Sequence, residues 1–329
     1  MAHDILCDML IARDQPKLLS IVIPMFNEVE VFPVLKEEIT RVRAELPCPV
    51  EVILVDDGSA DATYQLMHDW AGEDAAIKII ALSRNFGHQI AITAGMDASA
   101  GDAVVIMDAD LQDPPSLVPE MIAGYCEGYD VVYGQRTERE GETWFKRATA
   151  SMFYELMRRF VDERLPANTG DFRLVSRRVI EDLRRIREHD RFMRGLVAWV
   201  GYPQKALPYK RPARAAGVTK YPLMKMVRFA LNAILSFSAL PLKLISYVGF
   251  LSVLVSFVFV GRTLYQYWFD REALVLGWAS LAVLVSFFSG VILLSIGALG
   301  IYVAKIHTEV QERPLYLIRH SVNFEEEPR

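Results

Sequence analysis

Residues 50–59 read VEVILVDDGS, and the rest of the chain can be interpreted outward from them. Val50 to Val55 is a mostly apolar run rich in β-branched side chains, and two aspartates, a glycine and a serine follow it directly. A short apolar run that stops at turn-forming residues is typical of a buried strand. We therefore expect a strand over 50–55, with Asp56 and Asp57 at its carboxyl end.

Similar apolar runs recur on both sides of this strand. We expect further strands at 18–24, 77–82, 103–107 and 131–133, separated by helical patterns that end near residues 46, 71, 100 and 124. Strands that alternate with helices at this spacing indicate an α/β domain, with helices on both faces of a mostly parallel sheet. Ligands of such sheets bind outside the carboxyl ends of the strands, where Asp56, Asp57, Asp108 and Asp110 lie.

The chain becomes strongly apolar beyond Lys243. Residues 244–261 and 273–304 carry no charge, and a helix needs about 20 apolar residues to cross the hydrocarbon core of a bilayer. We expect two membrane spans joined by a short turn at 270–272, with the Lys- and Arg-bearing outer flanks on the cytoplasmic side. The preceding segment, 221–242, has an apolar helical stripe and either lies in the membrane interface or packs on the soluble domain.

Composition excludes several other classes of protein. The net charge of -5 argues against nucleic acid as a partner. The three cysteines are far apart and indicate neither a disulfide framework nor a zinc site. Charged residues within the N-terminal apolar stretch argue against a cleaved signal peptide, so the soluble part is expected to stay in the cytosol.

Residues 108–114, DADLQDP, form the sharpest motif. Alternate positions of an extended strand end point the same way, so Asp108, Asp110 and Gln112 are expected to present oxygens to one side. Magnesium commonly takes one or two carboxylates plus diphosphate oxygens, and such a metal neutralises a departing nucleoside diphosphate. The alternative is an acidic turn in solvent. The position at a strand end, about 50 residues after another aspartate pair at a strand end, favours a site for Mg²⁺ or Mn²⁺.

Six strings stand out along the chain: SIVIPMFNE (20–28), VDDGS (55–59), SRNFGH (83–88), DADLQDP (108–114), GDFRLVSR (170–177) and GVTKYP (217–222). In these strings the chain resembles glycosyltransferase family 2, and within it the polyprenyl-phosphate branch of dolichyl-phosphate mannosyltransferases and bacterial undecaprenyl-phosphate glucosyltransferases. The resemblance covers nearly the whole chain from Leu18.

The resemblance implies a GT-A type, Rossmann-like catalytic domain in the cytoplasm. The implied organisation is an N-terminal extension at 1–17, the catalytic domain at 18–220, juxtamembrane amphipathic helices at 221–242, a two-helix transmembrane hairpin at 243–305 and a cytoplasmic tail at 306–329. Small residues in the second span, such as Gly297 and Gly300, favour a homo-oligomer.

The resemblance also implies roles for individual residues. The nucleotide-sugar is expected to bind at Pro24, Asn27, Glu28, Asp57, Asp108 and Lys220. The metal is expected at Asp108, Asp110 and Gln112. The acceptor phosphate is expected to bind at Arg136, Arg173, Ser176, Arg211 and Arg214. The residues expected to act in the reaction are Asp110, Asp171, Arg136 and Arg173.

Asp171 matches a residue often assigned as a catalytic base. A lipid phosphate has a second pKa near 6 and is already largely ionised at neutral pH, so a base contributes little to its attack. Positioning and charge neutralisation are expected to dominate. We therefore expect Asp171 to orient Arg173 or a sugar hydroxyl, with proton abstraction as the second interpretation.

The expected reaction is the inverting, metal-dependent transfer of one hexose, from UDP-glucose in the first instance, to undecaprenyl phosphate at the inner membrane. Other sugars (GDP-mannose, UDP-N-acetylhexosamine, a UDP-amino-arabinose derivative) and other lipid acceptors are the alternatives, and so is a non-catalytic membrane scaffold that binds nucleotide-sugars. Polymer synthesis is disfavoured, because Arg191 stands where the processive synthases of this superfamily have the Gln of a Gln-x-x-Arg-Trp motif.

Overall fold

The computed structural model describes residues 10–137, 169–210 and 277–325 without a break, together with single positions between 245 and 269. The chain divides into two compact units. One comprises Met1–Pro222 with Pro314–Arg329, and the other comprises Leu223–Arg313. We call them the catalytic unit and the apolar unit and describe each by itself.

The described elements follow one another along the chain as expected for an α/β protein. The strands are β1 (Leu19–Met25), β2 (Val50–Asp56), β3 (Ile77–Leu82), β4 (Ala103–Ile106), β5 (Val131–Arg136), β6 (Thr169–Ser176), β7 (Gln204–Tyr209) and β8 (Ile318–Val322). The helices are α2 (Phe32–Glu45), α3 (Thr63–Glu73), α4 (His88–Ala98), the short 3-10 turn η1 (Pro115–Leu117), α5 (Val118–Cys126), α7 (Arg177–Arg185), α8 (Met193–Trp199) and α11 (Trp278–Val310).

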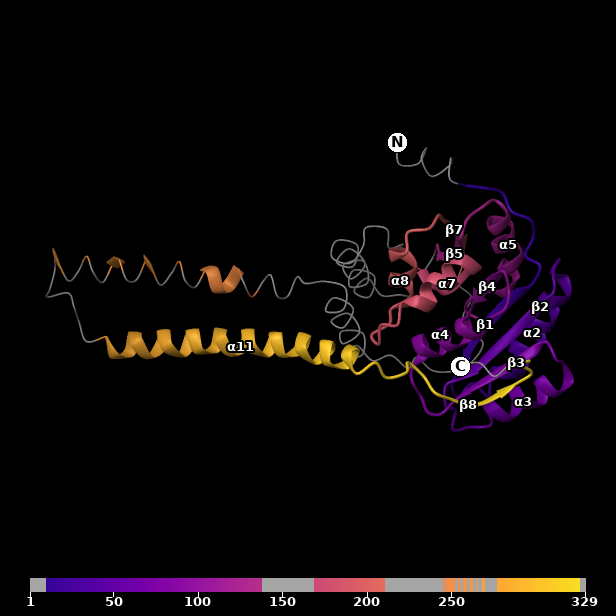
Figure 1. Cartoon of the computed structure of the whole chain (residues 1–329), viewed down its shortest axis with the longest axis horizontal. Coiled ribbons are helices and arrows are strands. Elements are labelled where there is room, and N and C mark those ends of the chain that lie inside the picture. Colours follow the sequence, from indigo (N-terminus) through magenta and orange to yellow (C-terminus); the bar gives the residue numbers. More distant parts are fainter. Residues whose placement is uncertain are drawn as a thin grey trace. The chain divides into compact units, whose positions relative to one another are not determined.

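The eight strands form one sheet in the order β7-β5-β6-β4-β1-β2-β3-β8 (Figure 1). The neighbours β1 to β4 are parallel, as the sequence predicts. Strand β6 runs antiparallel between β4 and β5, and β8 closes the other edge antiparallel to β3. The expected mostly parallel α/β sheet is confirmed, but the sequence did not predict β6, β7 or β8.

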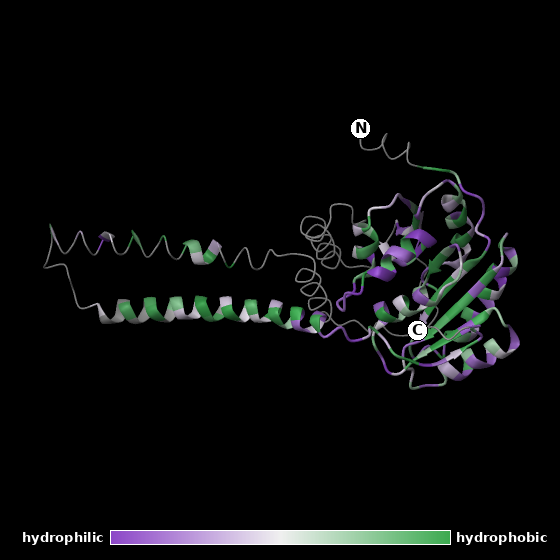
Figure 2. Ribbon diagram, viewed as in Figure 1, coloured by the Kyte–Doolittle hydropathy of each residue, from purple (hydrophilic) through white to green (hydrophobic). Residues whose placement is uncertain are grey.

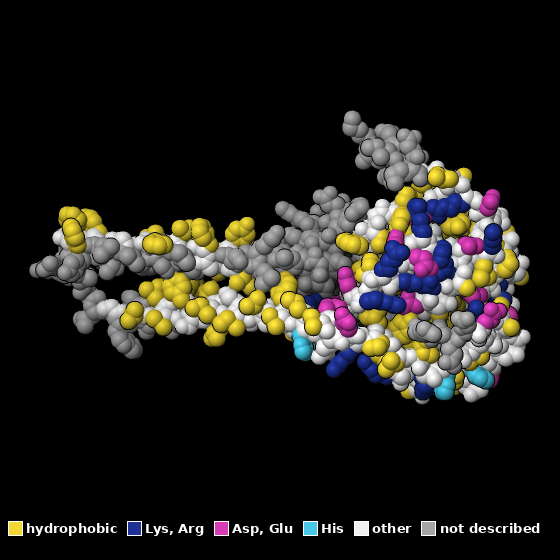
Figure 3. Space-filling view, viewed as in Figure 1, with side chains coloured by type: hydrophobic (Ala, Val, Ile, Leu, Met, Phe, Trp, Pro, Cys, Tyr) yellow, Lys and Arg dark blue, Asp and Glu magenta, His cyan; other side chains and the backbone are white. Residues whose placement is uncertain are grey.

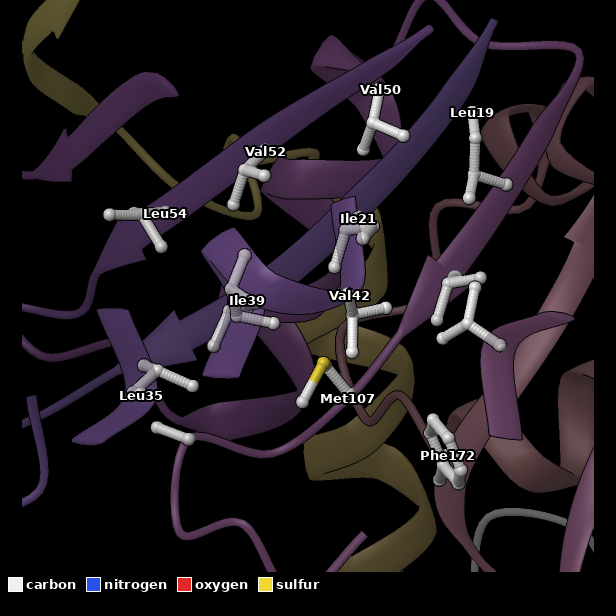
Figure 4. Packing of buried hydrophobic residues seen from close by; sticks show 14 of the residues in the cluster. Leu19, Ile21, Leu35, Ile39, Val42, Val50, Val52, Leu54, Met107 and Phe172 are labelled. Atoms are coloured by element: carbon white, nitrogen blue, oxygen red, sulfur yellow. The ribbon is translucent and has the colours of Figure 1, made fainter. Parts of the chain in front are cut away.

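The main core lies on the face of the sheet that α2, α3 and α5 cover. Alternate residues of β1 and β2 point into it, and α2 meets them with an apolar stripe that includes Leu35, Ile39 and Val42 (Figure 4). The spacing of these residues places them on one helical face. Pro33 in the first turn suits the helix start, where its missing N–H is not needed.

Helix α4 crosses the opposite face and lies directly against β1. A Cβ atom added to Gly95 would stand 2.3 Å from Cγ1 of Val22 and 3.1 Å from Cγ2 of Val55. No carbon atoms approach so closely, so only glycine permits this distance between helix and sheet. Because β3 is followed by α4 and then by β4, this helix carries the chain back across β1 and β2.

The apolar unit contains α11, which is long and apolar enough to cross a membrane. Within Phe287–Val310, an 18-residue window has a mean hydropathy of 2.1, and the 24 residues of helix extend about 36 Å. Large apolar side chains such as Leu293 and Ile296 are exposed along it (Figures 2 and 3). The first expected span lies mostly outside the described residues, and within the described part of the chain α11 is the one such helix.

Two glycine substitutions test the packing of α4. Gly95→Ala is expected to lower the free energy of unfolding by about 1–3 kcal/mol, because the new methyl group overlaps Val22. Gly72→Ala in α3 is the matched control, since nothing lies within 4 Å of its added Cβ. Alanine there is expected to stabilise the helix by about 0.5–1 kcal/mol. Thermal unfolding of the detergent-solubilised protein measures both changes. A stabilising Gly95→Ala would contradict the packing described here.

Candidate active site

The carboxyl ends of β1, β2 and β4 and the amino end of β6 meet at one side of the sheet, which we call the edge of the site. Met25 pairs with Asp56, and Ile106 pairs with both Val22 and Arg173. Two residues beyond Ile106 comes Asp108, and two residues before Arg173 comes Asp171. The antiparallel direction of β6 therefore brings Asp171 to the level of Asp108, at the carboxyl ends of the parallel strands.

Pro24 is buried in a central strand, where proline usually removes a ladder hydrogen bond. In a parallel strand, the backbone N–H and C=O groups of residues 23 and 25 point toward one neighbouring strand, and those of residue 24 point toward the other. The carbonyl of Met25 accepts from the amide of Asp57, so residues 23 and 25 face β2. The nitrogen of Pro24 thus faces β4, whose last paired residue is Ile106. The ladder between β1 and β4 ends here, at the point where the strand order reverses and α/β sheets bind their ligands.

The loops after β1 and β2 hold each other. The amide N of Asn27 donates to the Ser59 hydroxyl at 3.0 Å, and the Asn27 side chain accepts from the amide of Ala60 at 2.8 Å. The amide of Glu28 donates to the Thr63 hydroxyl at 2.9 Å. Asn27 has a φ of 54°, a left-handed conformation that asparagine tolerates. Asn27 and Glu28 therefore lie at the expected edge, with their backbone fixed by the neighbouring loop.

The two aspartates after β2 bind backbone rather than solvent. Asp56 is fully buried and accepts from the amide of Ser59 at 3.0 Å. Asp57 is 3% exposed and accepts from the amides of Phe86 and Gly87 at 2.7 and 2.9 Å. Burial raises the pKa of Asp57, and these two hydrogen bonds oppose the rise. Asp57 thereby fixes the start of α4 beside the candidate site.

The 108–112 motif forms a turn rather than an extended strand end. Strand β4 ends at Ile106, Asp110 accepts from the amide of Gln112 at 3.1 Å, and Leu111 has a φ of 56°. Asp108, Asp110 and Gln112 are all partly exposed. The described residues contain no group of three or more His, Cys, Asp or Glu side chains arranged to hold a metal.

The donor chemistry of this turn nevertheless fits Mg²⁺ or Mn²⁺. Asp108, Asp110 and Gln112 offer hard oxygen donors that ligands can reach. Magnesium often takes only one or two carboxylates from the protein and completes its shell with substrate phosphate and water. A site of this type does not need three protein carboxylates.

The carboxylate of Asp171 is bound by three side chains at this edge. Its Oδ1 lies 2.9 Å from Nε of Arg194. Its Oδ2 accepts from the side-chain amide of Gln89 at 3.0 Å and lies 3.4 Å from Nε2 of His88. The side chain is only 5% exposed. Burial raises the pKa of Asp171, but Arg194 and His88 outweigh it, so that this pKa is well below its usual value. Asp171 is therefore a carboxylate ion at neutral pH.

His88 lies between two carboxylates. Its Nε2 is 3.3 Å from Oδ1 of Asp108 and 3.4 Å from Oδ2 of Asp171. Burial opposes the charged form, but the two carboxylates outweigh it and raise the pKa of His88 well above its ordinary value. The imidazolium thus contributes a positive charge to the site at neutral pH.

Arg173 is a buried cation two residues beyond Asp171 on β6. It is 2% exposed, and its Nη2 donates to the carbonyl of Gly170 at 2.9 Å. Its Nε is buried and has no hydrogen-bond partner within the described residues. Burial lowers the pKa of Arg173 to about 10, so it remains charged at neutral pH. An anion that reached Nε would satisfy this donor.

A second cluster holds Arg136. Its Nε donates to the hydroxyl of Tyr209 at 3.1 Å, its Nη2 lies 3.3 Å from Oδ1 of Asp113, and Tyr209 donates to the same oxygen at 2.5 Å. A Cβ atom at Gly170 would stand 2.6 Å from Nη2 of Arg136, so the glycine makes room for the guanidinium. The first residues of β6 therefore contact both clusters, Gly170 at Arg136 and Asp171 at Arg194.

Ser176, a further predicted residue, is not brought to this edge. Ser176 pairs with Ala103 at the opposite end of β6 and donates to Oδ1 of Asp130 at 2.7 Å. Five residues of strand separate it from Asp171, roughly 16 Å. Because β6 runs antiparallel to β4, its two ends lie at opposite edges of the sheet. Arg211, Arg214 and Lys220 lie outside the described residues.

Four residues of the two clusters were absent from the sequence-based prediction, Gln89, Asp113, Arg194 and Tyr209, and His88 entered it only within the string 83–88. Asp113 stands within the 108–114 motif, and its position there was the available signal. The other three come from elements that only tertiary structure brings to the edge.

Comparison with known proteins identifies the family of the chain. The sequence profile of glycosyl transferase family 2 matches residues 20–184. An uncharacterized glycosyltransferase of Bacillus subtilis, YkcC, is 45% identical over 306 residues, which cover 93% of this chain and 94% of that protein. The SfII prophage-derived bactoprenol glucosyl transferase of Shigella flexneri is 37% identical over 308 residues, with 92% and 98% covered.

A distant likeness exists to the glucosyl-3-phosphoglycerate synthase of Mycobacterium tuberculosis, solved with Mn²⁺, uridine diphosphate and glucosyl-3-phosphoglycerate. It is 20% identical, with a TM-score of 0.41 over 67% of this chain and 78% of that one. The profile match and the two sequence relatives are the findings that fix the family. The chain belongs to glycosyl transferase family 2.

Proposed function

We propose that this glycosyltransferase moves a single hexose from a nucleotide-sugar, UDP-glucose in the first instance, to a polyprenyl phosphate at the cytoplasmic face of the membrane. Support for the acceptor comes from relatives named bactoprenol glucosyl transferase, such as the one from Shigella flexneri. Support for the location comes from α11, whose length and hydropathy suit a membrane span.

The state of Asp171 is the observation that carries the proposal. A general base works best with a pKa near the operating pH and with a free oxygen within reach of the proton that it removes. Asp171 has a strongly lowered pKa, and both of its oxygens are engaged by Arg194, Gln89 and His88. It is a poor base, and it suits an acceptor that arrives without a proton to lose. A phosphate monoester, largely a dianion at neutral pH, is such an acceptor.

The proposed step needs no proton transfer. An oxygen of the acceptor phosphate attacks the anomeric carbon of the sugar from the face opposite the nucleotide and forms the new C–O bond. The bond between that carbon and the diphosphate oxygen breaks, and its electron pair leaves with UDP. The configuration at the anomeric carbon is therefore inverted. The step moves negative charge from the acceptor phosphate to the departing diphosphate.

The cationic side chains of the site can stabilise the negative charge that moves from the acceptor phosphate to the diphosphate. Arg194 and Arg136 have 28% and 17% exposed side chains and can reach an anion, while Arg173 on β6 is buried. We assign the acceptor phosphate to these arginines and the donor to the opposite loops with Asn27 and Glu28. Asp171 orients Arg194 and His88. Electrostatic stabilisation of this kind is usually the largest contribution to catalysis.

A divalent cation held by Asp108 and Asp110, with Gln112 beside them, would neutralise the departing diphosphate when bound. Asp108 also lies beside the imidazolium of His88, so the protein itself supplies one cation at this position. We assign Pro24 and Asp57 to the support of the donor site: they fix the backbone there and contact ligands less directly than Asn27.

Two alternatives remain distinct from this proposal. A lipid alcohol as acceptor would lose a proton on attack and would need a base, which the pairing of Asp171 disfavours. A non-catalytic scaffold would bind nucleotide-sugars without turnover. The identity of the sugar depends on hydroxyl contacts that none of the described hydrogen bonds specifies.

A donor screen tests the reaction directly. The purified full chain with undecaprenyl phosphate, Mg²⁺ and a panel of UDP- and GDP-sugars is expected to release UDP and to yield a glucosylated phospholipid from UDP-glucose. Lipid mass spectrometry and nucleotide release are the measurements. A product with another donor would change the sugar, a product only with diacylglycerol or ceramide would change the acceptor, and tight UDP binding without any product would favour the scaffold.

Asp171→Asn tests the role of the carboxylate. Loss of the charge removes the carboxylate that Arg194 and His88 share, and we expect kcat to fall by about a hundredfold through misplacement of these groups. The deficit is not expected to shrink between about pH 6 and about pH 9, because Asp171 is ionised throughout that range. Rate measurements across this range check it. Recovery of activity at high pH would show that Asp171 removes a proton.

The same ion pair has a predictable effect on stability. The pKa of Asp171 is lower in the folded protein than in the unfolded chain, so ionisation of Asp171 stabilises the fold. This stabilisation is complete above the unfolded-state pKa of about 3.9 and is lost as pH falls through the lower folded-state pKa.

Removal of the metal is the third test. Excess chelator is expected to abolish turnover, and added Mg²⁺ or Mn²⁺ to restore it. Asp110→Asn is expected to raise the Mg²⁺ concentration required for half-maximal rate by at least about tenfold, since a neutral amide is a weaker ligand. Asp69→Asn, an exposed aspartate on α3, is the matched control and is expected to behave as wild type. Full activity in chelator would refute the metal requirement.

A further inference from the structure

The C-terminal segment 314–325 belongs to the catalytic unit and lies along the outer edge of its sheet (Figure 1). Strand β8 pairs antiparallel with β3 from Ile79 to Leu82. Beyond it, the side chain of Asn323 donates to the carbonyls of Ala71 and Ile77, both at 2.8 Å. Residues 311–313 alone separate this segment from the last residue of α11.

Two adjacent residues of this segment bind Asp97 and Ser83. The hydroxyl of Tyr316 donates to Oδ2 of Asp97 at 2.9 Å, near the end of α4. The carbonyl of Leu317 accepts from the amide of Ser83 at 2.8 Å, directly after β3. Residues 316 and 317 therefore hold both ends of the segment 83–97.

The segment 83–97 carries much of the candidate site. Its amides at Phe86 and Gly87 donate to Asp57, and His88 and Gln89 contact Asp171. The Gln89 side chain also accepts from the amide of Met193 at 2.9 Å and so joins α4 to α8. Because α4 is a continuous helix, a displacement at its end is transmitted to its start.

The carboxylate of Asp97 is held from two sides. Nη1 of Arg187 lies 2.6 Å from Oδ2, the same oxygen that receives the Tyr316 hydroxyl. Arg184 donates to the carbonyl of Asp97 at 2.6 Å. The two arginines come from α7 and the residues after it, so Tyr316 is the contact that ties the end of α4 to the C-terminal segment.

We infer that Tyr316 is a positioning residue: through Asp97 and α4 it sets where His88 and Gln89 meet Asp171. With the carbonyl of Leu317, it makes the alignment of the site depend on the segment attached to α11. The effect on rate rests on the proposed function, since the rate measured is that of glycosyl transfer. The effect on the placement of α4 does not.

Tyr316→Phe removes the hydroxyl and keeps the ring. We expect kcat/KM to fall roughly fivefold, in line with the loss of one hydrogen bond expressed in the transition state. Amide hydrogen exchange of peptides covering 83–92 is expected to become faster. Asn323→Ala is the matched control: it loosens the same segment at the far end of β8, so it is expected to lower Tm and leave kcat/KM and the exchange of 83–92 unchanged.

A merely structural role predicts a different result. In that case both variants lower Tm and change activity in proportion to stability, or Tyr316→Phe leaves kcat/KM and exchange at wild-type values. Either outcome overturns the inference. The double variant Tyr316→Phe with Gln89→Ala adds a second readout: if Tyr316 acts through the start of α4, it loses little more activity than Gln89→Ala alone, whereas multiplied losses refute that route.

The exchange experiment separates this inference from the proposed function. If the wild-type chain makes no product with any donor, the proposed function fails, and the exchange of 83–92 in the two variants still decides the role of Tyr316. If the wild type is active and Tyr316→Phe changes neither readout, only the present inference fails.

Discussion

The site depends on the burial of one negative charge. Asp171 is 5% exposed, and an isolated carboxylate at such a position would be very costly without compensation. Arg194 from α8 and His88 and Gln89 from α4 supply that compensation, so two helices distant in sequence are fixed relative to β6. Removing one partner from a buried ion pair costs far more than the pair contributes, because the other charge is left uncompensated.

The direction of β6 decides which residues can act together. Antiparallel to β4, it starts at the edge where the parallel strands end, so Gly170 and Asp171 enter the site and Ser176 does not. Gly170 makes room for the guanidinium of Arg136, and its neighbour Asp171 binds Arg194. The first residues of β6 thus contact both the cluster around Arg136 and the cluster around Asp171 and Arg194.

This arrangement also explains what the sequence could and could not predict. Strands β1 to β4 are apolar runs, and local pattern was sufficient to place them and the carboxylates after them. Strand β6, TGDFRLVS, contains Asp171 and Arg173 and shows no apolar run, because its buried charges are neutralised by tertiary partners. Asp57 was predicted at the pocket, but spacing could not show that the amides of residues 86 and 87 occupy its oxygens.

The acceptor proposal and the buried carboxylate are two aspects of one electrostatic argument. A site that receives a nucleoside diphosphate and a lipid phosphate must hold two anions close together, and like charges at short range repel. Arg136, Arg173, Arg194 and His88 already pair with or lie near carboxylates, which keeps these cations in place before any substrate arrives. Arg173, whose pKa is lowered to about 10 by burial, gains most from an incoming anion, since that anion stabilises its charge. Preorganised cations of this kind favour an acceptor that brings negative charge and give no comparable advantage to a neutral hydroxyl.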